Sequence, residues 1–279
     1  MHLIHGRIAE KYWLRGRIGI MKIPSTDIAD IKDAFTTASR ELMEACDEAP
    51  MMSQRLSENT PEMLLDAMAR LLDTWQCFEN DRSKPCREPF GEEDEERLLS
   101  EREILELGDY GLDLLSRIVT LAGALGLREH SRKLESLAFP MALWLARNGG
   151  EIGRLEPVVN GVARLANAIR DHVQLEELWH LISELVQAVS PAVSQDMEST
   201  DPQRPWRILL FNWAIVATRT HRPALMVTAF DALVQNLPDD APNFFREGMG
   251  QMDALDYPPQ VRAVMETYFD VWSVKKTLH

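Results

Sequence analysis

Residues 204–238, RPWRILLFNWAIVATRTHRPALMVTAFDALVQNLP, decide the fold of this chain. Apolar residues recur every three or four positions on both sides of Arg222, and Pro223 suits the first turn of a new helix. The stretch therefore predicts a helix of about 17 residues, a short joint and a second helix. Such a pair cannot bury its own apolar faces, so neighbouring pairs must stack against it.

A weak internal repeat supports this stacking. A shift of 47 or 48 residues brings apolar and proline positions of one pair onto those of the next. The matched positions are Pro157 with Pro205, Leu165 with Trp213, Leu178 with Met226, Leu185 with Leu233, and Ile118 with Leu165. The sequence thus favours successive helix pairs, and a helical domain without repeats is the alternative.

Helical spacing extends over the whole chain, and strand signals are nearly absent. We expect an all-α protein of about ten helices, with its C-terminal two-thirds stacked as antiparallel helix pairs in an α-solenoid. Three regions follow: a basic extension at 1–24, an N-terminal helical pair and loop at 25–91, and a helical-hairpin repeat region at 92–279, continuous with 25–91 as one domain. The expected helices begin at Ser25, at Thr60–Pro61 and at the acidic run 92–96, and then cover 129–147, 153–171, 174–190, 204–220, 223–237, 241–254 and 259–275.

At the level of architecture, residues 107–275 resemble the tetratricopeptide repeat and related helical hairpins. Phe230 and Pro238 are spaced as the phenylalanine and closing proline of that repeat, whereas Met226 and Leu233 occupy places where the repeat has small residues. The resemblance implies stacked hairpins whose first helices line a concave surface that binds a protein segment.

Composition limits the partners and the compartment. The 279 residues carry a formal charge of −14, so the chain repels nucleic acid, and the acidity favours partner segments that contain Lys or Arg. No stretch approaches the roughly 20 apolar residues of a membrane span, and charges interrupt any signal peptide. The three cysteines are too few for a disulfide framework, so we expect a cytoplasmic protein. The sequence indicates nothing about the oligomeric state.

Motifs for catalysis and for cofactors are missing. The chain has no Gly-x-Ser-x-Gly elbow and no glycine-rich phosphate loop. Glu177 and His180 form a single Glu-x-x-His motif, where a di-iron bundle needs two. Cys77 and Cys86 lie close enough in sequence for a redox disulfide, although isolated thiols are the default expectation. We therefore expect no metal site, no cofactor and no catalytic residues.

One polar stripe is the best candidate for a binding surface. Asn160, Arg164, Asn167 and Asp171 fall on one face of the helix expected at 153–171, and the repeat shift sets Arg164 against Asn212 and Asp171 against Arg219. Amide and guanidinium donors in these positions could bind a peptide backbone or carboxylate. An ordinary solvated helix face is the alternative reading of the stripe.

We accordingly expect a non-enzymatic interaction module, such as an adaptor, assembly factor or regulatory scaffold. The first alternative is a maturation chaperone or sensor that encloses a small ligand or cofactor. The second is a helical enzyme with an unrecognised site, for which Glu177 and His180 would be the first candidates.

Overall fold

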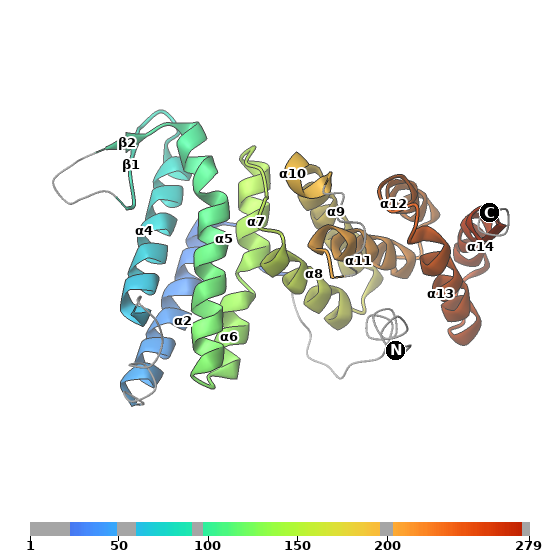
Figure 1. The fold of residues 1–279 in the computed structure, drawn as a ribbon, viewed down its shortest axis with the longest axis horizontal. Helices are drawn as coiled ribbons and strands as arrows, with labels where there is room; N and C mark the ends of the chain where they lie inside the picture. The colour runs from blue at the N-terminus through green and yellow to red at the C-terminus, as the bar shows by residue number, and fades with distance from the viewer. Residues whose placement is uncertain (1–22, 49–59, 91–96, 196–202, 275–279) are drawn as a thin grey trace. The chain divides into compact units, whose positions relative to one another are not determined.

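The computed structural model describes residues 23–48, 60–90, 97–195 and 203–274. In these ranges eleven helices have eight residues or more, and α10 (Pro191–Ser194) adds a single turn (Figure 1). The expected all-α class is confirmed. Nearly all of the basic extension 1–24, and the whole acidic run 92–96, lie outside the described residues. No helix among the described parts is long and apolar enough to cross a membrane.

Contacts group the described residues into two compact units, which we treat separately. The N-terminal unit holds residues 24–161 and 187–195, and the C-terminal unit holds residues 162–186 and 203–274. The division falls inside helix α8 (Glu156–Ala168) and near the end of α9 (His172–Ala188), so each of these helices contributes to both units.

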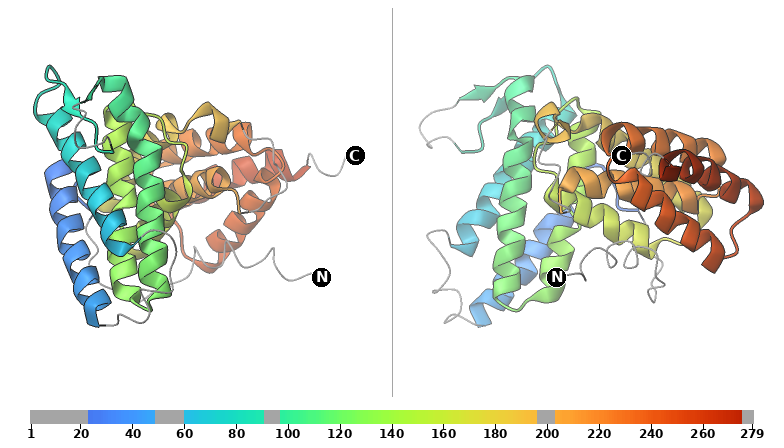
Figure 2. Two further views of the ribbon diagram at one scale, coloured as in Figure 1. Left: turned by 60° about the vertical axis from the view of Figure 1, so that its left-hand side comes forward. Right: turned by 45° about the vertical axis from the view of Figure 1, so that its right-hand side comes forward.

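The N-terminal unit is a helical bundle. Helix α4 (Pro61–Asn80) packs against both α2 (Ile28–Glu48) and α5 (Glu101–Ala124), and α5 also packs against α6 (Arg128–Glu135) and α7 (Ala138–Arg147) (Figures 1 and 2). Trp75 of α4 stacks on Trp144 of α7 with ring centroids 4.6 Å apart, and Trp144 Nε1 donates to Glu79 at 2.6 Å. These rings are buried, so they anchor α4 to α7 across the bundle.

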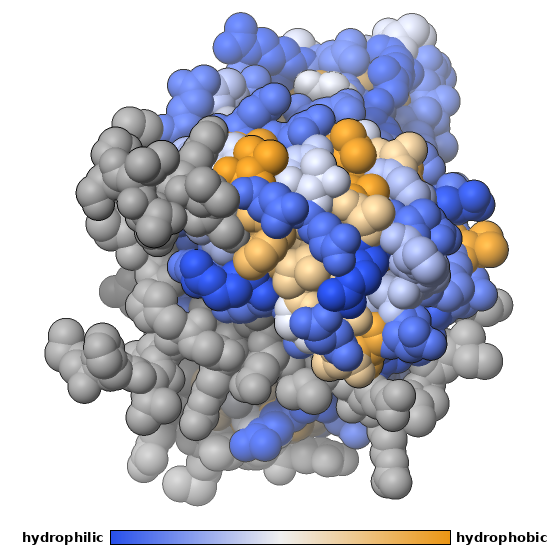
Figure 3. All heavy atoms as spheres, turned by 90° about the vertical axis from the view of Figure 1, so that its right-hand side faces the viewer, coloured by the Kyte–Doolittle hydropathy of each residue, from blue (hydrophilic) through white to orange (hydrophobic). Residues whose placement is uncertain are grey.

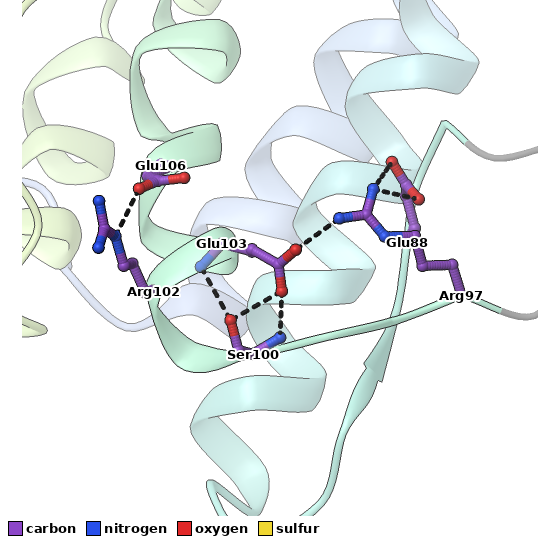
Figure 4. A network of polar contacts seen from close by, with 6 residues as sticks. All are labelled: Glu88, Arg97, Ser100, Arg102, Glu103 and Glu106. Atoms are coloured by element: carbon purple, nitrogen blue, oxygen red, sulfur yellow. Dashed lines mark hydrogen bonds and ion pairs between the residues drawn. The ribbon is translucent and has the colours of Figure 1, made fainter.

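The helix starts follow capping chemistry, with two differences from expectation. Thr60 caps α4 as predicted, since its side chain accepts from the Met63 N–H at 3.3 Å. Helix α2 starts three residues after Ser25, because Asp27 supplies the cap by accepting from the Ala29 N–H at 2.8 Å. Helix α5 starts only at Glu101, where Ser100 and Glu103 form a capping box (Figure 4).

The helix expected at 129–147 is wrong as a single element. It breaks after Glu135 into α6 and α7. Pro140 has no N–H to donate to the carbonyl of Ser136, and its ring would clash with that carbonyl in a continuous helix. In the third position of α7 the missing N–H costs nothing.

A short antiparallel ribbon was not expected. Strand β1 (Cys86–Arg87) pairs with β2 (Leu98–Leu99), with Cys86 opposite Leu99. Arg97 holds the ribbon to the start of α5 by contacting Glu88 at 3.2 Å and Glu103 at 2.5 Å (Figure 4). Hydrogen bonds from the Ser100 N–H and hydroxyl, together with Arg97, lower the pKa of Glu103.

The C-terminal unit contains the stacked helix pairs. Helix α11 (Pro205–Arg219) packs on α12 (Pro223–Asn236), and α13 (Ala241–Ala254) packs on α14 (Pro259–Val274) (Figure 2). The first helices of the two pairs meet through Phe211 and Phe244, whose rings are 5.3 Å apart, and the second helices meet through Phe230 and Tyr268 at 5.1 Å. Adjacent pairs therefore stack first helix on first and second helix on second.

Helix α9 joins this stack through aromatic rings. Trp179 stacks on Trp213 of α11 at 5.4 Å, and Trp213 Nε1 donates to Ser183 Oγ at 3.0 Å. Both tryptophans are buried. They serve packing, as most tryptophans in helical segments do.

Candidate functional site

The structure separates the members of the predicted stripe. Asn160 is exposed on α8, in the N-terminal unit, whereas Arg164 and Asn167 are half-buried on the part of α8 that belongs to the C-terminal unit. Asp171 lies beyond the end of α8 and caps α9, because its Oδ1 accepts from the N–H groups of Val173 at 3.1 Å and Gln174 at 3.0 Å. Asp171 is thus occupied by helix capping, although it is exposed.

Asn212 lies inside the C-terminal unit. Only 1% of its surface is exposed, and its amide group donates to the Ile208 carbonyl in the same helix at 2.9 Å. Its Oδ1 has no hydrogen-bond partner among the described residues. Helix α11 is buried over most of its circumference, so the apolar spacing of its sequence does not reveal a solvent-facing side.

Arg219 closes the C-terminus of another helix. Its guanidinium donates to the carbonyls of Ala166 and Ile169, at 2.6 Å for Ile169. These carbonyls belong to the last turn of α8 and the residue after it, where no helical N–H is available. Burial, and then the charge of Arg170, lower the pKa of Arg219. Its contacts therefore hold α8 in place.

Ring side chains gather where Arg219 lies. His172 Nδ1 is 2.9 Å from the Arg219 carbonyl oxygen, and because a carbonyl only accepts, Nδ1 donates in this contact and Nε2 takes no part in it. The His172 and His221 rings are 4.4 Å apart, and His221 meets the edge of Tyr257 at 5.3 Å. The three rings come from the joints within three successive helix pairs: α8–α9, α11–α12 and α13–α14.

The environment favours the neutral forms of His221 and Tyr257. Burial, followed by the nearby His172, lowers the pKa of His221, and burial raises the pKa of Tyr257 against the opposing effect of Arg219. His221 also has a φ of 59°, a conformation that few residues other than glycine, asparagine and aspartate adopt. Packing at the joint therefore fixes both the backbone and the charge state of His221.

Exposed residues border the three rings. Val173, which follows His172, is 74% exposed, and Arg222 forms an exposed ion pair with Glu176 at 3.2 Å. We use the name joint surface for the exposed residues His172, Val173 and Arg222 together with the half-buried residues His221 and Tyr257.

The sequence analysis did not predict the residues of the joint surface as site residues. The signal was nevertheless present, because Arg170 and His172 recur 49 residues later as Arg219 and His221. The shift of 47 or 48 residues, chosen on apolar positions, misaligned these pairs by one or two residues.

The face formed by α12, α13 and α14 has a mixed polar and apolar surface. The exposed large apolar residues of α12 and α14 are Val227 and Val271. Over the described part of the face that these helices share with α13, hydrophilic residues separate the apolar ones (Figure 3). This face therefore offers scattered apolar side chains, which are normal on a protein surface.

Metal chemistry gains no support in the described residues. No group of three or more His, Cys, Asp or Glu side chains there could hold a metal ion. His180 is exposed and contacts the edge of Trp179 at 5.1 Å, and Glu177 is exposed as well.

A separate cleft lies in the N-terminal unit, between α4 and the ribbon. It has a volume of about 390 Å³, within the usual range for small-molecule sites. Side chains of both charges line it, together with one thiol: Arg70, Asp73, Thr74, Cys77, Arg87, Glu88 and Pro89.

Comparisons with known proteins name no function for these sites. The chain matches no family model, and neither a curated protein nor a solved structure is significantly similar to it.

Proposed function

We propose that the protein is a non-enzymatic interaction module, an adaptor or regulatory scaffold, that binds a protein segment at the joint surface of its C-terminal unit. One observation carries the proposal: His172, His221 and Tyr257 converge from the joints of three successive helix pairs. Aromatic and arginine side chains are enriched in protein interfaces, where rigid rings contribute contact area at low entropic cost.

The contacts beneath the joint surface make it rigid before a partner arrives. Arg219 fixes the end of α8, Asp171 fixes the start of α9, and the His172 Nδ1 contact fixes the imidazole ring. Preorganisation of this kind lowers the entropic cost of binding. The Nε2 atom of His172 and the Arg222 guanidinium then provide polar groups for contact with a peptide backbone or carboxylate.

The repeat type, the chemistry of the partner and the cellular compartment are part of the same proposal. The contacts of α11 with α13 and of α12 with α14 support a repeat of the tetratricopeptide type. The charge of −14 supports a protein partner whose bound segment contains Lys or Arg, rather than nucleic acid, and the cysteine content supports the cytoplasm. Of the predicted stripe, Arg164 and Asn167 remain candidate contacts in the C-terminal unit, whereas Asn160 lies in the N-terminal unit and Asn212 is buried.

Two matched variants test the proposal. Val173→Asp places a charge in the joint surface at the second position of α9, where a carboxylate is compatible with the helix dipole. Val271→Asp makes the same change on α14, at a residue that is 53% exposed. Tagged full-length proteins are purified from the native cell, and their co-purifying proteins are quantified by mass spectrometry.

We expect Val173→Asp to reduce the recovery of the specific partner at least tenfold and Val271→Asp to leave it unchanged. Equal recovery with all three proteins, or a loss confined to Val271→Asp, would refute the joint surface as the binding site. Circular dichroism of each variant confirms that the helical content is retained.

A further inference from the structure

Two cysteines meet at the wall of the α4 cleft. Cys77 lies near the end of α4, is half-buried and lines the cleft, while Cys86 is on β1 and is fully buried. The Cys86 thiol also lies 3.8 Å from the Lys84 carbonyl oxygen. The two cysteines thus approach each other from different elements of the N-terminal unit.

Neighbouring contacts fix this approach. The Thr74 hydroxyl, one turn before Cys77 on the same face of α4, is 3.2 Å from the carbonyl of Arg87, the residue after Cys86. Cys86 is paired with Leu99 in the ribbon, and Arg97 ties the ribbon to the capped start of α5. Strand β1 is therefore held by α4 through Thr74 and by β2 through the ribbon pairing.

The two thiols interact directly. Burial, and then the hydrogen bond and charge interaction with Cys77, raise the pKa of Cys86 to about 12. Cys86 consequently remains protonated at neutral pH. Cys77 has the more accessible sulfur, since the cleft opens onto it.

We propose that Cys77 and Cys86 form a redox modification site, in which a hydroperoxide oxidises Cys77 and Cys86 resolves the product to an intramolecular disulfide. Cys77 is the residue that peroxide reaches, and Cys86 is the resolving residue. The disulfide links α4 to the ribbon and replaces the free thiol in the cleft wall.

The chemistry balances in two steps. The Cys77 sulfur attacks one oxygen of hydrogen peroxide, the O–O bond breaks, and the departing hydroxide takes the thiol proton to form water and a sulfenic acid. The Cys86 sulfur then attacks the Cys77 sulfur, an S–S bond forms, and the S–O bond breaks. The second hydroxide leaves with the Cys86 proton as water, so two thiols and one peroxide give one disulfide and two waters. A dithiol such as dithiothreitol returns both cysteines to thiols by exchange.

The high pKa of Cys86 slows the second step, because the attacking sulfur must lose its proton. The sulfenic acid of Cys77 should therefore live long enough to be trapped by dimedone. Cys46 is an internal control, since it is buried on α2 and burial raises its pKa as well.

Peptide mapping of the full chain tests the site. Trypsin cleaves after Arg70, Arg82 and Arg87 but not between Lys84 and Pro85, so it releases Cys77 in residues 71–82 and Cys86 in residues 83–87. After treatment with a few equivalents of hydrogen peroxide, we expect a mass loss of about 2 Da and a cross-link between these two peptides. Dithiothreitol should reverse both changes, and Cys46 should stay alkylatable after denaturation.

Two variants test the order of the steps. In Cys86→Ser, dimedone labelling of Cys77 should rise at least fivefold, because nothing resolves the sulfenic acid. In Cys77→Ser, Cys86 should remain a thiol under the same treatment. Unchanged dimedone labelling in Cys86→Ser would overturn the resolving role.

The wild-type map alone also decides the proposal. A covalent dimer through Cys77, a disulfide that includes Cys46, or oxidation of Cys77 to sulfinic acid without the cross-link would each overturn it. These outcomes are read without any variant, so a folding defect of a serine variant cannot mask the result.

Discussion

Replacing Arg219 by alanine should destabilise the C-terminal unit by about 3 kcal/mol. The guanidinium donates two charge-assisted hydrogen bonds to the carbonyls of Ala166 and Ile169, and each such bond contributes roughly 1.5–3 kcal/mol. Its loss leaves two helix-end carbonyls without this donor. The gross loss of about 3–6 kcal/mol is offset in part because a charge beside Arg170 is no longer buried.

The assay is urea unfolding followed by far-ultraviolet circular dichroism, with amide hydrogen exchange as the local readout. Since 1.4 kcal/mol corresponds to a tenfold change in an equilibrium constant, exchange in the last turn of α8 should accelerate roughly 100-fold. Arg219→Lys keeps the charge but cannot reach both carbonyls in the same fork geometry, so it should recover only part of the loss.

Arg222→Ala is the matched control. It removes an arginine three residues further on, whose ion pair with Glu176 is exposed and should contribute only about 0.2–1 kcal/mol. If Arg219→Ala destabilised the protein no more than Arg222→Ala, or left exchange in α8 unchanged, the capping role of Arg219 would be refuted.

Three further predictions concern other positions. Gly111→Ala should destabilise the protein by about 1–3 kcal/mol in urea unfolding, because a Cβ there would lie 2.6 Å from a leucine methyl and 3.3 Å from a tryptophan ring of α4. Gly123→Ala on the same helix has its nearest neighbour at 3.9 Å and should stabilise it by about 0.5–1 kcal/mol. The lowered pKa of His221 means that the unfolded chain binds its proton more readily, so stability should fall as the pH drops below about 6.5. His221→Asn, which tolerates the positive φ, should remove that part of the pH dependence measured by thermal unfolding. Tyr268→Phe removes a 2.5 Å hydrogen bond to Asp231 and should cost about 1 kcal/mol in the same assay.

Local sequence signals predicted most of the helices. The positions of proline and aspartate residues predicted the observed bounds of α13, 241–254. They predicted the bounds of α11 and α12 to within one residue at each end. These signals act through the few residues at a helix end, where capping groups and missing N–H donors decide the outcome. They therefore need no knowledge of what packs against the helix.

The missed features depend on longer-range structure. Leu98 continues the seven-residue apolar spacing of α5, yet it lies in β2, because pairing with Arg87 and the capping box at Ser100 compete with a longer helix. The break between α6 and α7 has a local signal in Pro140, which the expected helix at 129–147 did not take into account.

The difference between local signals and longer-range packing also explains which residues of the candidate site were predicted. Asn160 is exposed as the stripe predicts, but Asn212 is buried because α11 is covered on most sides by its neighbours. A single-helix pattern shows which residues share a face; it does not show how many faces the neighbours cover. The contact between His172 and His221, which lie 49 residues apart, follows from the stacking of joints and has no local signature.

Stacking also gives a physical reason for the polar side chains to concentrate at the joints. Each helix end leaves up to four N–H or C=O groups without helical partners, and these need side-chain partners wherever water is excluded. Arg219, Asp171 and His172 meet this need with one part of each side chain. For His172 the capping contact uses only Nδ1, and Nε2 takes no part in it. Because the fold holds the ring through one nitrogen, the other nitrogen can serve recognition without loss of stability. Changes to the buried capping contacts should therefore alter the stability of the fold, whereas changes to the exposed atoms of the joint surface should alter the binding that we propose there.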